Sequence, residues 1–131
     1  MSEDTRYQHG LDIVEKVYGP GSSEMMKGME ASPFVNETVS NLFGEVWSRP
    51  GLSMRDKRLL VLGATATMGR PDLVEIQTRG ALLNEEFTEA QLEEISLLML
   101  FYVGAGNTTA LHRGMQTALA KLKAEKVAIQ A

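Results

Sequence analysis

Apolar residues recur along this chain at helical spacing, and glycine or proline marks the ends of most stretches. The clearest pattern follows the i, i+3, i+4, i+7 rule of one helix face and consists of Val39, Leu42, Phe43 and Val46. This helix should stop near Ser48, because Pro50 has no amide hydrogen and disfavours helical backbone at the preceding residue.

A turn at Pro50-Gly51 separates this helix from the next one. Ser53 and Asp56 resemble a capping pair, so the next helix should begin at about Met54. Similar signals predict a helix over residues 5 to 18 and a short one around Met25 to Met29, which follows a Ser22 or Ser23 cap. Later in the chain they predict helices from Pro71 to Asn84 and from Thr88 to Val103, and a last helix that follows an Asn107 or Thr108 cap. We expect the tail after residue 124 to fray. The pattern predicts an all-α, compact single-domain bundle of about six to seven helices over residues 1–131.

One predicted face contains a polar residue in an apolar stripe. The face of the helix from Pro71 consists of Leu73, Ile76, Gln77, Gly80, Ala81 and Asn84. Burying the Gln77 amide is costly unless its hydrogen bonds are satisfied, so a polar group should face it. Gln77 is therefore either a core residue satisfied by backbone or another side chain, or a residue that lines a polar pocket.

The last two predicted helices carry two further candidates. The helix from Thr88 is apolar on most sides, which predicts a central position in the fold. Near its end, Tyr102 either lines a pocket or is an aromatic residue at the edge of the core. His112 borders the apolar face of the final helix.

Composition and charge narrow the range of functions. The chain has 17 acidic against 13 basic residues, which offers no electrostatic case for nucleic acid or an anionic membrane. The absence of cysteine excludes disulfides, thiolate nucleophiles and thiol-based peroxide chemistry. No apolar run is long enough to cross a bilayer and the N-terminus is polar, so we expect a cytoplasmic protein. Phosphate-loop, dinucleotide and metal-ligand motifs are missing, which favours chemistry without cofactor or metal, or no chemistry.

A charged corner lies between the helix that should stop near Ser48 and the helix that should begin at about Met54. It holds one acidic and three basic residues, Glu45, Arg49, Arg55 and Arg58, beside the aromatic residues Phe43 and Trp47. Such a set can form an anion pocket with an aromatic wall. Alternatively, Glu45 and Arg49 are a solvated i, i+4 pair and the arginines form a solvent-exposed face.

The residues of this corner resemble a known family motif. Trp47-Ser-Arg-Pro-Gly-Leu52, with Arg58-Leu59-Leu60 after it, is similar to the Trp-x-Arg-Pro-Gly-Leu-x-x-Arg-x-Arg-x-Leu motif of the carboxymuconolactone decarboxylase family. Shorter pieces similar to this family are Tyr7-Gln-His-Gly-Leu11, Arg79 to Leu82 and Tyr102-Val-Gly104. The resemblance runs from about Tyr7 to Leu119 and implies the all-α fold of the alkylhydroperoxidase D-like superfamily.

The resemblance also reveals a departure. Decarboxylases of this family carry a histidine, thought to act in proton transfer, four residues before the position of Ala81, and this chain has Gln77 there. An amide cannot shuttle a proton near neutral pH, so the family reaction should fail here or use another group. The redox branch has a Cys-x-x-Cys-x-x-x-His signature whose positions are Arg70, Leu73 and Gln77 here, so we exclude a peroxidase.

The resemblance implies roles for the candidate residues. Glu45 would be the catalytic acid or base, and Gln77 would orient the substrate. The substrate-binding residues would be Arg49, Arg55, Arg58, Trp47 and Tyr102, with the arginines holding a carboxylate and an oxyanion. His112 is either a replacement proton carrier or a structural or interface residue. No metal and no cofactor is implied.

Three functions are compatible with the resemblance. The first is a cofactor-free lyase that decarboxylates a small anionic lactone or keto acid by acid/base catalysis, in the catabolism of aromatic compounds. The second is a different reaction on such a substrate, for example isomerisation or cyclisation. The third is a non-catalytic oligomeric ligand-binding protein. Family members commonly form homohexameric rings, so we expect a homo-oligomer, either a hexamer or a trimer, without a nucleic-acid or membrane partner.

Overall fold

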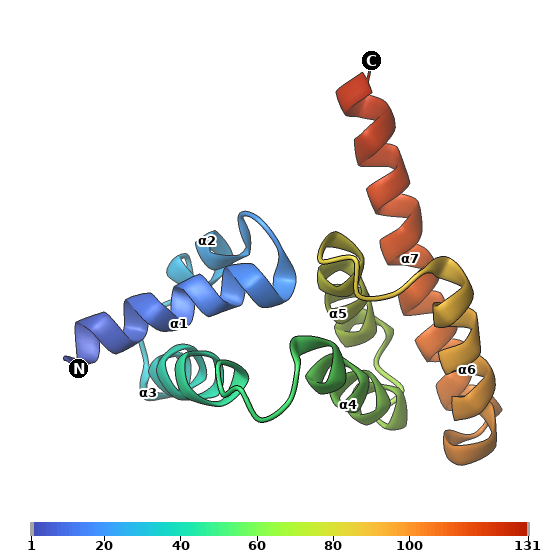
Figure 1. Ribbon diagram of the computed structural model, residues 1–131, viewed down its shortest axis with the longest axis horizontal. Helices are drawn as coiled ribbons and strands as arrows, with labels where there is room; N and C mark the ends of the chain where they lie inside the picture. The colour runs from blue at the N-terminus through green and yellow to red at the C-terminus, as the bar shows by residue number, and fades with distance from the viewer. Residues whose placement is uncertain (1, 131) are drawn as a thin grey trace. The chain divides into compact units, whose positions relative to one another are not determined.

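Helices make up all the regular structure of residues 2–130, the part of the chain that the computed structural model describes. They are α1 (Glu3–Tyr18), α2 (Ser22–Lys27), α3 (Pro33–Glu37), the π-helix η1 (Thr38–Trp47), α4 (Met54–Thr67), α5 (Pro71–Leu83), α6 (Glu89–Val103) and α7 (Ala105–Gln130), as drawn in Figure 1. The all-α prediction is confirmed. The chain clusters into two compact units that divide between Lys57 and Arg58. The assignment of a single functional domain stays a prediction.

In the first unit, α1 packs directly against η1. Their backbones approach most closely at Gly10, where a Cβ atom would lie 1.9 Å from the carbonyl oxygen of Val39. Gly44 of η1 lies at the same crossing, since a Cβ atom there would be 3.4 Å from the Cα atom of Gly10. Leu11, Val35 and Val39 form the buried cluster beside it. Gly10 is therefore required by packing.

The helix predicted to contain Val39 to Val46 and to stop near Ser48 exists, but this part of it is a π-helix with a different buried row. Val39, Phe43 and Trp47 are buried, whereas Leu42 and Val46 are 44% and 52% exposed. A π-helix bonds residue i to i+5 and is wider than an α-helix, so the face read with α-helical spacing is only partly the buried face. Its end agrees with the prediction, because Ser48 is the C-terminal cap.

The turn after η1 also agrees with the prediction. Pro50 and Gly51 form it, and the Ser53 side chain accepts a hydrogen bond from the Asp56 amide at 3.0 Å at the start of α4. Lys57 adds an anchor, because its Nζ donates to the carbonyl oxygens of Trp47 at 2.7 Å and Arg49 at 2.5 Å. A cation at the C-terminal carbonyls of a helix is favourable, so Lys57 fixes the corner within the first unit.

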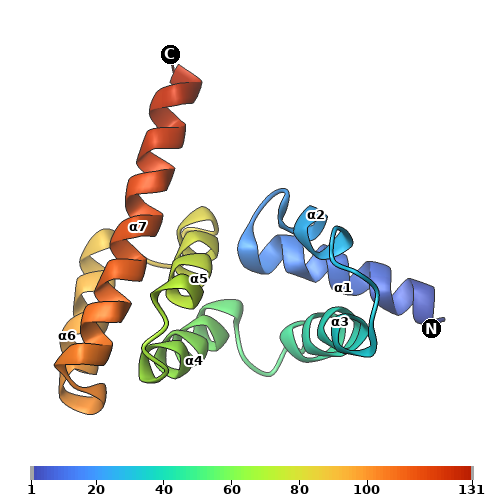
Figure 2. The ribbon, with the colours of Figure 1, turned by 180° about the vertical axis from the view of Figure 1, so that it is seen from behind.

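In the second unit, α7 packs against α5 and α6, as both ribbon views show (Figures 1 and 2). At the contact between α5 and α7, a Cβ atom on Gly114 would lie 2.6 Å from the carbonyl oxygen of Pro71. The two backbones therefore approach more closely than a residue with a side chain would allow. The core cluster consists of Leu62, Ala66, Val74, Ala81, Phe87, Leu92, Leu111, Met115 and Leu119.

α6 differs from its prediction. Its start agrees with the prediction, because Thr88 and Gln91 form a capping box in which the Thr88 hydroxyl accepts from the Gln91 amide. Only Leu92 and Ser96 are buried, however, and many apolar side chains are exposed, namely Leu97, Leu98, Leu100, Phe101 and Tyr102. α6 rests on α7 along one face, which leaves the remaining apolar residues at the surface of the chain. The prediction of a central helix is therefore wrong for the single chain.

The last helix starts earlier than predicted. α7 begins at Ala105, directly after Gly104, whose positive φ of 88° reverses the backbone, so Asn107 and Thr108 lie inside the helix. The residues after 124, where the sequence predicted fraying, continue α7, and the side chains of residues 123–129 are exposed. Among the described helices, none has the length and apolar character needed to span a membrane.

Candidate active site

A buried polar cluster lies in the second unit and contains two of the predicted site residues. Arg58 comes from α4, Gln77 from α5, and Glu86 from the loop after α5. Arg58 donates from Nε to Glu86 Oε1 and from Nη2 to Glu86 Oε2, both at 3.1 Å, and from Nη1 to Gln77 Oε1 at 2.8 Å. The cluster is thus a bidentate ion pair with an amide attached to it.

The end of α5 places Glu86 beside Arg58. Glu85 adopts a left-handed backbone conformation with a φ of 55°. Its amide donates to the carbonyl oxygen of Leu82 at 3.1 Å, and the Glu86 amide donates to that of Ala81 at 2.9 Å, which are the two bonds of a Schellman motif. The Asn84 side chain adds a hydrogen bond to Glu86 Oε2 at 3.1 Å. A helix-terminating turn therefore directs the carboxylate into the protein.

Gln77 is buried and its carbonyl oxygen is satisfied by a side chain. This contact agrees with the interpretation of Gln77 as a polar core residue with a partner. A role in lining a substrate pocket stays a prediction. The buried face of α5 is shifted from the predicted one, because Val74 and Thr78 are buried and Ile76 is exposed.

Glu45 and Arg49 form an i, i+4 pair in the first unit. Glu45 Oε1 lies 3.4 Å from Arg49 Nη1, and their side chains are 62% and 68% exposed. Such a pair contributes little to stability, on the order of 0.3–0.5 kcal/mol. Its exposure leaves both charges within reach of solvent, where a carboxylate can exchange protons and a guanidinium can bind an anion.

Trp47 is buried inside the first unit. Its ring stacks on Phe43 with centroids 6.3 Å apart and an interplanar angle of 12°, and Phe43 meets Tyr18 edge-on at 5.5 Å. The two aromatic residues predicted beside the charged corner therefore form a packed stack, and their role as the wall of a pocket stays a prediction. Its first effect is to hold η1 against α1, and a contact between Trp47 and substrate stays a prediction.

The other candidates lie at the surface. Arg55 is exposed on the first turn of α4, and Tyr102 is 80% exposed near the end of α6. His112 Nδ1 lies 3.7 Å from Glu93 Oε1 across a groove of about 330 Å³ between α6 and α7. The groove is otherwise lined by Ser96, Leu97, Leu100, Ala105, Thr108 and Thr109. His112 thus has a carboxylate neighbour in the second unit, in a groove that does not include Gln77.

The structure brings together Arg58 with Gln77 and Glu45 with Arg49. Sequence reasoning missed Glu86 and Lys57. The signal for Lys57 was present, because counting along the family motif places its third arginine on Lys57 rather than on Arg58. The signal for Glu86 was weak, since nothing in a polar Asn84-Glu85-Glu86 segment indicates which acidic residue turns inward.

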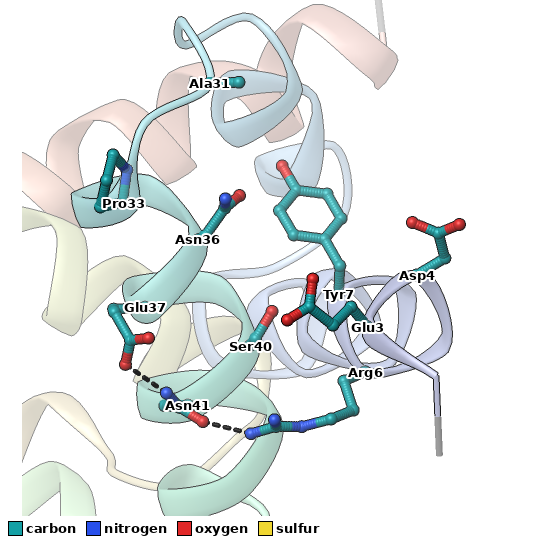
Figure 3. A pocket seen from close by; sticks show the side chains of 10 residues that line it. All are labelled: Glu3, Asp4, Arg6, Tyr7, Ala31, Pro33, Asn36, Glu37, Ser40 and Asn41. Carbon is teal, nitrogen blue, oxygen red and sulfur yellow. Dashed lines mark hydrogen bonds between the residues drawn. The ribbon is translucent and has the colours of Figure 1, made fainter.

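A separate pocket of about 610 Å³ lies in the first unit (Figure 3). It is lined by Glu3, Asp4, Arg6, Tyr7, Ala31, Pro33, Asn36, Glu37, Ser40 and Asn41. Arg6 donates to the Asn41 side-chain oxygen, and the Asn41 amide donates to Glu37. The lining residues do not include any of the predicted catalytic or substrate-binding residues. Within residues 2–130, no group of three or more metal-ligating side chains is present.

Comparison with known proteins places the candidate residues in a family context. Over 118 residues the chain is 29% identical to a 4-carboxymuconolactone decarboxylase of Acinetobacter baylyi, with 86% of this chain and 86% of the relative covered. The sequence model of the carboxymuconolactone decarboxylase family matches residues 33–114. That range includes every candidate from Glu45 to His112, together with Glu86. The chain therefore belongs to the carboxymuconolactone decarboxylase family.

Proposed function

We propose that this protein is a cofactor-free lyase that decarboxylates a small anionic lactone or keto acid. One observation carries the proposal, namely the alignment with a 4-carboxymuconolactone decarboxylase over 86% of both chains. In such a reaction the bond between a carbon and its carboxylate breaks and carbon dioxide leaves. The electron pair of that bond forms an enolate, which then takes a proton at carbon. No step requires a redox partner.

The exposed charges of the first unit suit this chemistry. Glu45 is the acid or base in our proposal, because its carboxylate is exposed and lies 3.4 Å from the guanidinium of Arg49. Arg49 and Arg55 are exposed cations that bind the substrate carboxylate and stabilise the enolate oxygen. Trp47 and Tyr102 complete the substrate-binding set in this proposal.

A further role in the proposal belongs to Gln77. Its side chain is bonded to Arg58, so Arg58 supports the amide from the protein interior. Gln77 orients the substrate and does not transfer the proton, because an amide does not titrate near neutral pH. Proton delivery then falls on Glu45, with His112 as the second candidate carrier.

One observation favours an alternative to decarboxylation. Gln77 stands where family decarboxylases have a histidine, which supports isomerisation or cyclisation of a related lactone or keto acid without loss of carbon dioxide. A non-catalytic ligand-binding protein is a further alternative, and retained ligand binding without turnover would favour it.

We also propose that the protein self-associates, as a hexamer or a trimer, and acts in the cytoplasm. The apolar side chains exposed on α6, among them Leu98 and Phe101, support self-association because a second copy would remove them from water.

The test is turnover of 4-carboxymuconolactone by the purified protein, followed by ¹³C NMR to separate released carbon dioxide from isomerised or ring-opened products. Glu45→Gln should lower kcat by about a hundredfold, the lower range for loss of a general acid or base. Glu24→Gln is the matched control, because Glu24 also belongs to an exposed ion pair, with Lys27 at 3.3 Å. Full activity of Glu45→Gln would refute the role of Glu45. Products that retain the carboxyl carbon would favour the alternative reaction.

A further inference from the structure

One side chain, Arg58, connects Glu86 to Gln77 inside the second unit. Both oxygens of Glu86 accept from Arg58 at 3.1 Å, and Arg58 Nη1 lies 2.8 Å from Gln77 Oε1. A guanidinium carries donors only, so the atom of Gln77 that faces it must be the carbonyl oxygen rather than the amide nitrogen. Arg58 therefore sets the orientation of the Gln77 side-chain amide, with the carbonyl oxygen toward the guanidinium.

Because these side chains are buried, the opposite orientation of the Gln77 amide is costly. The Arg58 side chain is fully buried and that of Glu86 is 7% exposed, so the interactions act in a medium of low dielectric. A flipped Gln77 would place N–H groups against the N–H groups of Arg58 and leave buried donors without acceptors. Because Glu86 holds the Nε and Nη2 edge of the guanidinium in a two-point contact, Nη1 stays directed at Gln77.

We propose that Glu86 is a positioning residue that sets the orientation of the Gln77 amide through Arg58. With its carbonyl oxygen turned to Arg58, the Gln77 side chain directs its NH2 group away from the guanidinium, and any partner of that NH2 group must be a hydrogen-bond acceptor. If this NH2 group contacts substrate, a step that rests on the proposed function, the substrate atom there is an acceptor. It is a carbonyl, carboxylate or enolate oxygen, and not a hydroxyl or amine that must donate.

The first test does not depend on catalysis. The side-chain amide signals of Gln77 are assigned in ¹H–¹⁵N NMR spectra by their loss in Gln77→Leu. Glu86→Gln should shift these signals, because Nη1 loses its fixed direction. Glu85→Gln should leave them in place, since it makes the same change at an exposed neighbouring residue. Unchanged Gln77 signals in folded Glu86→Gln would overturn the proposal. If Glu86→Gln does not fold, Glu86→Asp takes its place, because it keeps the charge and shortens the reach.

The second test uses kinetics of the full-length protein. Glu86→Gln should lower kcat by about tenfold and change KM much less, as expected when an interaction made in the transition state is lost. In the Gln77→Leu background the same change should alter kcat by less than about twofold, because a residue that acts through Gln77 cannot act when Gln77 is absent. Equal effects in both backgrounds would show that Glu86 acts elsewhere. If the wild-type protein does not turn over the lactone, the proposed function fails while the NMR comparison still decides the role of Glu86.

Discussion

Arg58 and Glu86 face each other through two parallel hydrogen bonds of 3.1 Å, although they are 28 residues apart in the sequence. Both side chains are removed from water, and the planar guanidinium matches the two carboxylate oxygens. A paired charge of this kind is tolerated inside a protein, whereas either charge without its partner is not. This relationship leads to the first prediction.

Glu86→Ala should destabilise the protein by about 3–5 kcal/mol, because it leaves the buried guanidinium of Arg58 without its carboxylate. Urea unfolding followed by circular dichroism measures the effect. Glu85→Gln, an exposed change one residue away, should stay within about 0.5 kcal/mol of wild type. A loss below about 1 kcal/mol for Glu86→Ala would show that Arg58 finds another acceptor.

Gly10→Ala should destabilise the first unit by about 1–3 kcal/mol or more, since the added Cβ would lie 1.9 Å from the Val39 carbonyl oxygen and must push α1 away from η1. Gly51→Ala is the control, because no atom lies within 4 Å of a Cβ built there. Thermal unfolding of the two variants should differ clearly. Equal melting temperatures would contradict the close approach of the two helices.

Stability should depend on pH through Glu15. Burial raises the pKa of this carboxyl, but hydrogen bonds from the Gly21 amide, the Ser22 hydroxyl and the Ser23 amide outweigh burial and hold the pKa below its ordinary value of 4.5. The unfolded chain therefore binds this proton more tightly than the folded chain. The stabilisation is fully present above about pH 4.5 and is lost as the pH falls through the lower pKa of the folded state.

Urea midpoints measured between about pH 3 and pH 7 test this dependence. Glu15→Gln should lower stability at pH 7 and flatten the acid limb of the curve, because the amide does not titrate. Glu24→Gln, which alters an exposed acidic residue of the same unit, should retain the wild-type slope. An unchanged acid limb in Glu15→Gln would assign the dependence to other groups.

Gln77→His should increase decarboxylation, because it restores a side chain that can carry a proton at the position of the family histidine. The gain should approach about a hundredfold, the lower range for general acid–base catalysis. The neighbouring Arg58 cation disfavours the imidazolium, so the new activity should persist well below neutral pH. Rates of carbon dioxide release across a pH series measure it, with Gln77→Leu as the comparison that restores no proton carrier. If Gln77→His gives no gain over wild type, the proton carrier of the reaction is not at position 77.

Phe101→Glu should weaken the proposed self-association, because it places a charge among the apolar side chains exposed on α6. The fold should survive, since Phe101 is exposed in the single chain. Sedimentation velocity should show smaller species than wild type. Met25→Glu, at an exposed apolar residue of the first unit, is the comparison. An unchanged oligomer, or a wild-type monomer, would exclude α6 as the contact.

Most helix ends, though not the start of α7, were predictable from the sequence because the interactions that set them span only a few residues. Ser53 caps α4 through the amide three residues later, and Thr88 does the same for α6 through Gln91. Pro71 begins α5 because a missing amide hydrogen costs nothing in the first turn. All the groups that make such a cap lie within one short segment, so the sequence alone shows them. The family motif and the absence of cysteine can likewise be read directly from the sequence.

The tertiary structure alone decided which of these helices bury which side chains. Because η1 is a π-helix, the side chains that it buries include Val39 and Phe43 but differ from those that α-helical spacing predicts. Only one face of α6 is buried, so Phe101 is exposed to solvent. Within the candidate site, the sequence indicated Arg58 and Gln77 as separate polar residues. Their connection through Glu86 depends on a backbone reversal at Glu85 and on contacts between residues 19 and 28 positions apart. Such contacts form only when the helices pack, because burial and the exclusion of water make the pairing of these charges favourable.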